Sequence, residues 1–170
     1  MSRVRGTARR ALALGALLAL LGPLQAAHAG ADCSITTTGL AFGAYDSAAT
    51  QPDDSTATIT VTCVYVPPSA TSVSYTVTAS NGTFGNSPTA RRMGAGNGRL
   101  AYNVYTDPAR TQVWGTGTGG TVVASGSMTV GPGVGNGTRT RTHTIYGRAL
   151  AQQPSDPGSY LDSLVLTLTY

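Results

Sequence analysis

The chain has 170 residues, of which 11 are basic and 7 acidic, so its formal net charge is +4 and only 11% of its residues are charged. Such a low charge, together with 41% hydrophobic residues, excludes an intrinsically disordered protein. The sequence contains neither Glu nor Lys and is dominated by Thr, Ser, Gly and Val, which favours β-strands and tight turns over helices. At this length we expect one folded domain.

Residues 1–29 have the pattern of a secretory signal peptide. Four arginines precede an apolar run over residues 11–21, and Gly22-Pro23 ends that run. A membrane anchor is the alternative, but the run is much shorter than the roughly 20 apolar residues that cross a bilayer. Small residues at positions 27 and 29 predict cleavage after Ala29, which leaves residues 30–170 as the exported domain.

Removal of the signal peptide changes the charge of the domain. The four arginines leave with it, so residues 30–170 keep seven Arg and seven Asp and are close to neutral. A nucleic-acid-binding protein needs a basic surface that displaces counterions from phosphate. The exported domain lacks such a surface, and we expect no nucleic-acid partner.

Alternation of apolar and polar residues, the pattern of a half-buried strand, recurs along the domain. The predicted strands are residues 56–65, 72–80, 100–105, 121–130, 138–146 and 164–170. In the first of them Ala57, Ile59, Val61 and Cys63 alternate with threonines. Turn signals such as Asn-Gly and Asp-Pro separate the segments, and none shows a sustained helical period. The pattern predicts an all-β protein with an immunoglobulin-like β-sandwich.

The domain has two cysteines, Cys33 and Cys63. In an exported chain such a pair is most simply a disulfide, and the closed loop of about thirty residues would stabilise the fold by roughly 3.5–4 kcal/mol. Two free thiols, or half of a metal site, are the alternatives, but the sequence offers no second pair of ligands.

Residues capable of catalysis or ligand binding are few. His143 shares its strand parity with two arginines and Ile145, so we predict that it lies on a solvated face. Asp53-Asp54 could be a carboxylate pair or calcium ligands, although a loop before a strand is favoured. Residues 115–120 match G-x-G-x-x-G, but no helical pattern follows, which favours a flexible turn over a cofactor site. We therefore expect no enzyme activity, cofactor, metal site or small-molecule substrate.

Several short stretches occur together in one order along the domain. They are Phe42-Gly43-Ala44-Tyr45-Asp46, Arg91-Arg92-Met93, Leu100 to Asp107, Val113-Trp114-Gly115, Tyr146-Gly147-Arg148 and Gly158 to Tyr170. Each stretch is weakly specific, but the ordered set resembles the spore coat protein U domain over about residues 32–170. This family includes subunits of archaic chaperone–usher pili and secreted spore-coat proteins.

The resemblance implies a pilin-type sandwich that lacks its final strand. A periplasmic chaperone would lend the strand first, and the N-terminal extension of a sibling subunit would replace it at the outer-membrane usher. An open sheet edge beside an exposed core is completed in this way by a strand of another chain. The predicted acceptor groove has one wall from the last strand and one from the first strand. The wall from the last strand consists of Leu164, Leu166, Leu168 and Tyr170, and the wall from the first strand consists of Ile35, Leu40 and Phe42.

The resemblance therefore predicts a non-enzymatic fimbrial subunit, exported to the periplasm and then displayed on the cell surface or secreted. After cleavage, only Gly30, Ala31 and Asp32 would precede Cys33, too few for a donor segment. The subunit would then accept a strand without donating one, and would cap an assembly or act outside a long pilus. The alternatives are a secreted spore-coat or matrix protein that completes itself or works without an usher, and a tip-like adhesive module that uses loops at residues 94–99 or 115–120.

Overall fold

The computed structural model describes residues 30–68 and 70–170, so the predicted signal peptide and its cleavage after Ala29 lie outside the described residues. The described chain forms eight strands and one short 3-10 turn, η1 (Gly135–Gly137). The strands are β1 (Ala31–Thr37), β2 (Asp53–Tyr65), β3 (Thr71–Ala79), β4 (Arg91–Ala95), β5 (Gly98–Tyr105), β6 (Ala124–Val130), β7 (Thr138–Ala149) and β8 (Leu166–Thr169).

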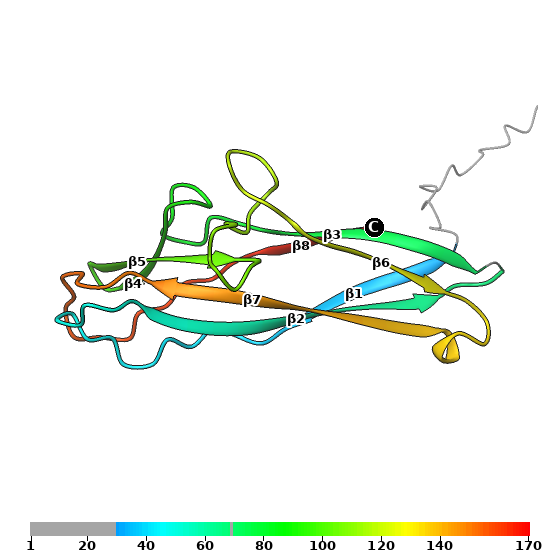
Figure 1. The fold of residues 1–170 in the computed structure, drawn as a ribbon, viewed down its shortest axis with the longest axis horizontal. Coiled ribbons are helices and arrows are strands. Elements are labelled where there is room, and N and C mark those ends of the chain that lie inside the picture. The colour runs from blue at the N-terminus through cyan, green and yellow to red at the C-terminus, as the bar shows by residue number, and fades with distance from the viewer. Residues whose placement is uncertain (1–29, 69) are drawn as a thin grey trace, which may run out of the picture.

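The strands form two antiparallel sheets that face each other. The larger sheet has the order β1-β2-β7-β5-β4 and the smaller one β6-β3-β8. Figure 1 shows them as the two layers of an elongated molecule. The predicted all-β sandwich is confirmed. In the described part of the chain, no helix has the length and apolar character needed to cross a membrane.

The centre of the larger sheet is the long pair of β2 and β7, whose register runs from Asp53 opposite Ala149 to Val64 opposite Thr138. Alternation decides which face of β2 is buried, because successive side chains of a strand point to opposite faces. The apolar set predicted for β2 faces the core: Ala57, Ile59, Val61 and Cys63 are all buried. The threonines between them lie on the outer face.

The core fills the space between the sheets. In β3, the central strand of the smaller sheet, Val73, Tyr75, Val77 and Ala79 are buried, as their alternation predicts. Trp114 completes the core from the segment between β5 and β6. It is 2% exposed, and its indole Nε1 donates a hydrogen bond to the Val77 carbonyl at 2.9 Å, so its polar atom is satisfied inside the core.

Strand β4 was not predicted, and β6 begins later than predicted. The β4 sequence Arg-Arg-Met-Gly-Ala shows no alternation because its two buried positions are Arg91 and Met93. The first residue of the predicted strand 121–130 belongs instead to the glycine loop, where the Thr121 hydroxyl donates to the Thr118 carbonyl. That loop is a turn, as predicted, with three of its glycines at positive φ and a strand, not a helix, as the next element.

Candidate functional site

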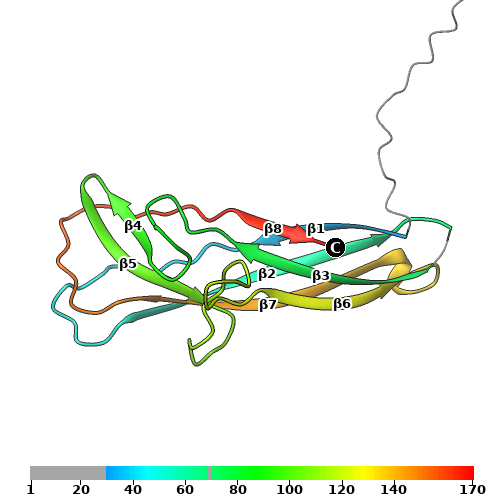
Figure 2. The same cartoon turned by 90° about the horizontal axis from the view of Figure 1, so that it is seen from above.

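The two sheets leave two unpaired strand edges on the same side of the molecule. β1 pairs with β2 alone, and β8 pairs with β3 alone among the described residues. Figure 2 shows β8 lying over β1 along one long side, whereas β6 lies over β7 along the other. Neither β1 nor β8 contains a proline, and their one charged side chain is Asp32. These edges therefore lack the residues with which proteins usually prevent pairing with another chain.

The side chains of the last strand are only half covered. Leu164, Leu166 and Leu168 pack against the core and are partly buried, whereas the intervening Val165 points outward and is 68% exposed. The alternation predicted for residues 164–170 is thus confirmed, although hydrogen-bonded pairing with β3 is confined to 166–169. The leucines stay partly exposed because, in residues 30–68 and 70–170, no strand pairs with β8 on its open edge.

The opposite wall comes only in part from the first strand. Ile35 lies in β1 and is half-buried. Leu40 and Phe42 do not belong to β1, which ends at Thr37; they lie in the irregular segment that follows. This segment rests on Gly147 of β7, where a Cβ atom would lie 2.9 Å from the Phe42 ring and 3.0 Å from Leu40. A glycine at position 147 is therefore what allows both side chains to reach the inner face of the sheet.

A cavity of about 260 Å³ opens between these walls. Its rim includes Leu40, Phe42, Leu164 and Leu166, and its floor reaches the fully buried core at Ile59 and Trp114. A second cavity of about 620 Å³ shares part of this lining, including Leu40, Phe42 and Tyr160. Of the predicted groove residues, Ile35, Leu168 and Tyr170 do not line the first cavity.

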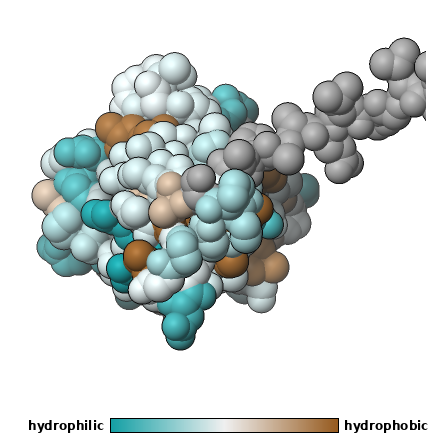
Figure 3. Space-filling view, turned by 90° about the vertical axis from the view of Figure 1, so that its right-hand side faces the viewer, coloured by the Kyte–Doolittle hydropathy of each residue, from teal (hydrophilic) through white to brown (hydrophobic). Residues whose placement is uncertain are grey.

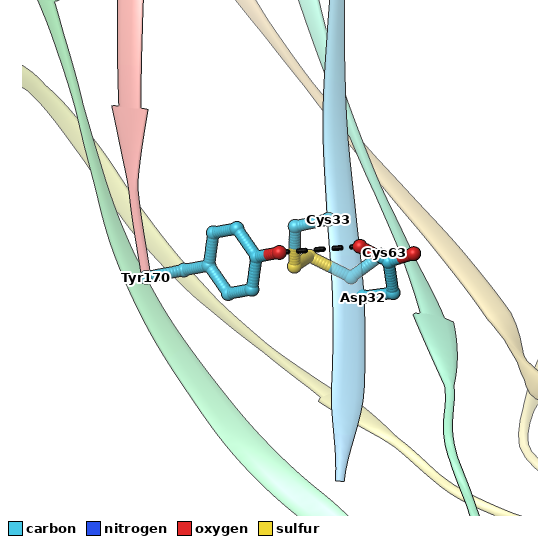
Figure 4. Close-up of a disulfide and its surroundings, with 4 residues drawn as sticks. All are labelled: Asp32, Cys33, Cys63 and Tyr170. Atoms are coloured by element: carbon cyan, nitrogen blue, oxygen red, sulfur yellow. Dashed lines mark hydrogen bonds between the residues drawn. A yellow bond between two sulfur atoms is a disulfide. The ribbon is translucent and has the colours of Figure 1, made fainter. Parts of the chain in front are cut away.

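The predicted disulfide is confirmed and supports this side of the sandwich. Cys33 of β1 and Cys63 of β2 are directly opposite in the register, and their sulfur atoms are bonded at 2.01 Å (Figure 4). Because β1 has a strand partner on one side only, the disulfide holds in place an edge that hydrogen bonds alone would hold weakly.

Arg91, whose role the sequence did not reveal, supports the other wall. Its side chain is fully buried, and its guanidinium donates to the carbonyls of Ser80 and Pro88 and to the Asn103 side chain at 2.7–2.9 Å. Burial lowers the pKa of Arg91. Ser80 in turn pairs with Val165: its backbone N–H donates to the Val165 carbonyl, and its hydroxyl accepts from the Val165 N–H. Arg91 thus holds the backbone against which β8 begins.

Asp162 ties the segment that precedes β8 to the rest of the fold. Its carboxylate accepts hydrogen bonds at 2.7 Å from the Tyr102 hydroxyl and from the backbone N–H of Thr83. Burial, followed by this bond to Asp162, raises the pKa of Tyr102 well above its usual value. The sequence around Asp162 did not predict this contact, because its partners are 60 and 79 residues away in the chain.

The prediction that His143 lies on a solvated face is wrong. His143 is half-buried on the inner face of β7, and its Nε2 lies 2.8 Å from the Tyr75 hydroxyl of the opposite sheet. Burial, with a smaller contribution from the positive charge of Arg141, lowers the pKa of His143. The two neighbouring arginines suggested a polar face, but Ile145 on the same face is buried and marks the true orientation.

The acidic pair does not form a ligand site. Asp53 and Asp54 begin β2 and do not lie in a loop before it, so as adjacent strand residues they point to opposite faces. Asp54 accepts two hydrogen bonds from Arg148, at 2.7 and 2.8 Å, and lies 3.2 Å from Arg110. The bond from Arg148 is the main cause that lowers the pKa of Asp54. Across residues 30–68 and 70–170, no three His, Cys, Asp or Glu side chains are grouped so that they could hold a metal ion.

The groove differs from the rest of the exposed hydrophobic surface. In an end-on view (Figure 3), hydrophobic side chains reach the surface in separate patches with polar residues between them. Val64 and Val66, at the end of β2, are 45% and 37% exposed. Isolated hydrophobic residues of this kind are normal on protein surfaces, whereas the side chains of the groove gather around a cavity between two unpaired strand edges.

Comparison with protein families now identifies the fold. The model of the spore coat protein U domain matches residues 21–167. The chain belongs to this family. The spore coat protein U match thus covers β1 to β7 and the start of β8, and confirms the resemblance seen in the sequence. A comparison with curated proteins finds no significant relative.

Among solved structures, the spore coat protein U chain is similar to a chain of the crystal structure of the CsuC–CsuE chaperone–tip adhesion subunit pre-assembly complex, from archaic chaperone–usher Csu pili of Acinetobacter baumannii. The TM-score is 0.52 at 20% sequence identity, and the match covers 82% of the present chain. It spans 40% of the length of the matched chain. At this identity the likeness concerns the fold, which is a β-sandwich of pilin type.

Proposed function

We propose that this spore coat protein U domain is a non-enzymatic structural subunit of a chaperone–usher-type surface fimbria, and that a strand of another chain fills its groove. Family membership and the fold shared with a chain of a chaperone–usher pre-assembly complex support the proposal. The partners would be a periplasmic chaperone, an outer-membrane usher and sibling subunits. The protein would be exported to the periplasm and then reach the cell surface.

One observation carries the proposal: the inner faces of β8 and of the segment after β1 are apolar but incompletely covered. The proposed acceptor residues are Ile35, Leu40, Phe42, Leu164, Leu166, Leu168 and Tyr170. Covering apolar surface contributes about 25 cal/mol for each Å² removed from water. A strand placed between β1 and β8 would cover the apolar side chains of this set that lie beside it and would also satisfy the free backbone groups of the edges that it pairs with.

The structure also bears on whether the subunit donates a strand. β1 begins at Ala31, the Gly30 carbonyl accepts a hydrogen bond from Val66, and Cys33 is bonded to Cys63. Residues from 30 onward therefore belong to the body of the sandwich, and a donor segment would have to precede them. With cleavage after Ala29, the proposed subunit accepts a strand but does not donate one, and it caps its assembly.

The contacts of the ionisable residues support a structural and not a catalytic role. His143 is hydrogen-bonded to Tyr75, Asp54 is paired with Arg148, and Arg91 is buried among backbone carbonyls. Catalysis requires an acid, base or nucleophile placed where a substrate can reach it. Each of these groups instead joins two parts of the fold.

The test is site-specific photocrosslinking in cells that secrete the full chain. Benzoylphenylalanine is placed at Leu166, whose side chain faces the groove, or at the neighbouring Val165, which faces outward on the same strand and serves as the control. We expect Leu166 alone to crosslink strongly to a chaperone or a sibling subunit, through an extended segment in which apolar residues alternate. Mass spectrometry of the crosslinked peptides identifies that segment.

Equal crosslinking at the two positions would contradict the proposal. So would a purified, protease-resistant monomer with no partner, since it would indicate that the chain completes itself as a secreted coat or matrix protein. The claim that the subunit only accepts is tested by mixing it with chaperone and sibling subunits, where insertion of its own N-terminus into a sibling would overturn that claim.

A further inference from the structure

The groove has two unlike ends. At one end, the walls formed by Leu40, Phe42 and Leu164 diverge around the cavity that reaches down to Trp114. At the other end, β8 ends at the level of the disulfide, and a side chain crosses from this end to β1 (Figure 4). This inference rests on the proposed function. If a strand of another chain fills the groove, the difference between the two ends decides how far that strand can extend.

Tyr170 is the side chain that crosses. It follows β8 directly, and its hydroxyl donates a hydrogen bond to the Asp32 carboxylate of β1 at 3.2 Å. Figure 4 shows the ring extending from the end of β8 toward β1, at the level of Cys33. The ring therefore occupies, between the two edges, the place that the backbone of an added strand would need.

The bridge is well suited to stop a strand without blocking the rest of the groove. Tyr170 is 40% exposed and Asp32 lies at the surface. A strand that displaced the ring would have to break its hydrogen bond to Asp32 and its packing. Leu164, Leu166 and Leu168 precede it on the same strand and remain open to a partner. Beyond them the gap is filled by this chain itself.

We propose that Tyr170 and Asp32 form a stop that fixes how far the inserted segment extends toward the disulfide. The occupant is an extended segment of another chain, with alternating apolar side chains and no charge toward the groove. It pairs along the span of Leu164 to Leu168 and ends, or turns away, before Tyr170. The stop thereby sets the register of the partner as well as its length, because a slip of one residue would turn the apolar side chains of the partner away from the core.

The experiment measures how binding depends on the length of the partner. The probes are uncharged synthetic peptides, capped at both ends, in which valine alternates with threonine over about five, seven or nine residues. For the unmodified protein we expect the dissociation constant to fall up to about five residues and then to change by less than about twofold. In Tyr170→Ala it should continue to fall, by about tenfold at nine residues, since each added pair gains backbone hydrogen bonds and cross-strand contacts.

Two further variants separate the stop from general effects on the fold. Asp32→Ala keeps the ring but removes its hydrogen-bond acceptor. In this variant the dissociation constant should also continue to fall with peptide length, but by only about threefold at nine residues. Thr169→Ala changes the neighbouring, outward-facing residue of β8 and should keep the length dependence of the unmodified protein. Thermal unfolding of each variant confirms that it is folded.

The possible failures are distinguishable. If peptides bind and Tyr170→Ala reaches its plateau at the same length as the unmodified protein, the stop is wrong while the proposed function stands. If no peptide binds to any of the proteins, the open groove does not accept strands, and the proposed function fails together with this inference.

Discussion

The two long sides of the sandwich are both built from antiparallel strands, but they differ in how far side chains cover the core. On the side of β6 and β7, the buried ring of Tyr75 meets His143 across the sheets, and Arg141 donates to the Ser127 carbonyl. On the side of β1 and β8, which lie over each other in Figure 2, leucines that face the core remain partly exposed and line a cavity. On the first side, side chains of the two sheets meet each other, whereas on the second side we propose that a strand of another chain fills the gap.

The comparison shows that incompleteness is confined to one side. On the closed side, that of β6 and β7, Tyr75 is buried and its hydroxyl pairs with His143, so the two sheets are packed against each other there. The open side is nevertheless firmly supported, by the disulfide beneath β1 and by Arg91 behind the start of β8. A groove with fixed walls loses less entropy when a strand binds than one that must first be ordered.

The largest expected effect is the loss of Arg91, which would break the support of the open side. Arg91→Met leaves the Ser80 and Pro88 carbonyls and the Asn103 side chain without their buried donor, and each unsatisfied group costs about 1–3 kcal/mol. We expect the free energy of unfolding to fall by about 4 kcal/mol, measured with urea. The control is the adjacent Arg92→Met, where the side chain is exposed and the change should stay within about 0.5 kcal/mol. Similar values for the two variants would show that Arg91 does not support the wall.

Two residues that face each other in adjacent strands allow a comparison of the core with the groove. Val77 and Leu168 are opposite each other in the register of β3 and β8, but Val77 is fully buried and Leu168 only partly. Val77→Ala should lower the free energy of unfolding by about 2–3 kcal/mol, and Leu168→Ala by about 1 kcal/mol, since water already reaches part of that leucine.

The expected order is the reverse of the usual one, because leucine normally loses more than valine on truncation to alanine. Urea unfolding of the isolated protein measures both values. A larger cost at Leu168 than at Val77 would mean that the groove is already filled in the isolated protein. In a complex with a strand-donating partner, the cost at Leu168 should rise toward that of a core residue.

The smallest expected effect concerns pH on the closed side. The pKa of His143 is lowered in the folded protein, first by burial and then by Arg141, so protonation favours the unfolded state. The stability that neutral His143 contributes is therefore present above the ordinary histidine pKa of about 6.5, and is lost as the pH falls through the lowered value. Because the ring is partly solvated, the loss should be a fraction of about 1 kcal/mol.

Urea unfolding at pH 7.5 and 5.5 tests this, since the carboxylates remain ionised over that interval. His143→Gln keeps a polar group near Tyr75 but does not titrate, and it should remove most of the difference between the two pH values. An unchanged pH dependence in that variant would assign the effect to another group.

The sequence alone predicted most of the strands and both faces of β2 and β3, because threonine alternates there with Ile, Val and Ala, and a strand must turn one set inward. It also predicted the disulfide, since the domain has one pair of cysteines, and the alternating leucines that end the chain. The family resemblance added the groove. Its residues are Ile35, Leu40, Phe42, Leu164, Leu166, Leu168 and Tyr170, and the structure places Leu40 and Phe42 beyond the strand expected to carry them.

Only the tertiary structure decided the remaining features, and each depends on residues far apart in the chain. Arg91 is buried because carbonyls of Ser80, directly after β3, and of Pro88 converge on it. Asp162 is held by Tyr102 and Thr83, which are 60 and 79 positions away in the chain. His143 faces inward, where its ring is hydrogen-bonded to the buried Tyr75 of the other sheet. The arginines beside it in the sequence had indicated the opposite orientation. Local alternation fixes which face of a strand is apolar, but which groups meet across the sandwich depends on how its two sheets are brought together.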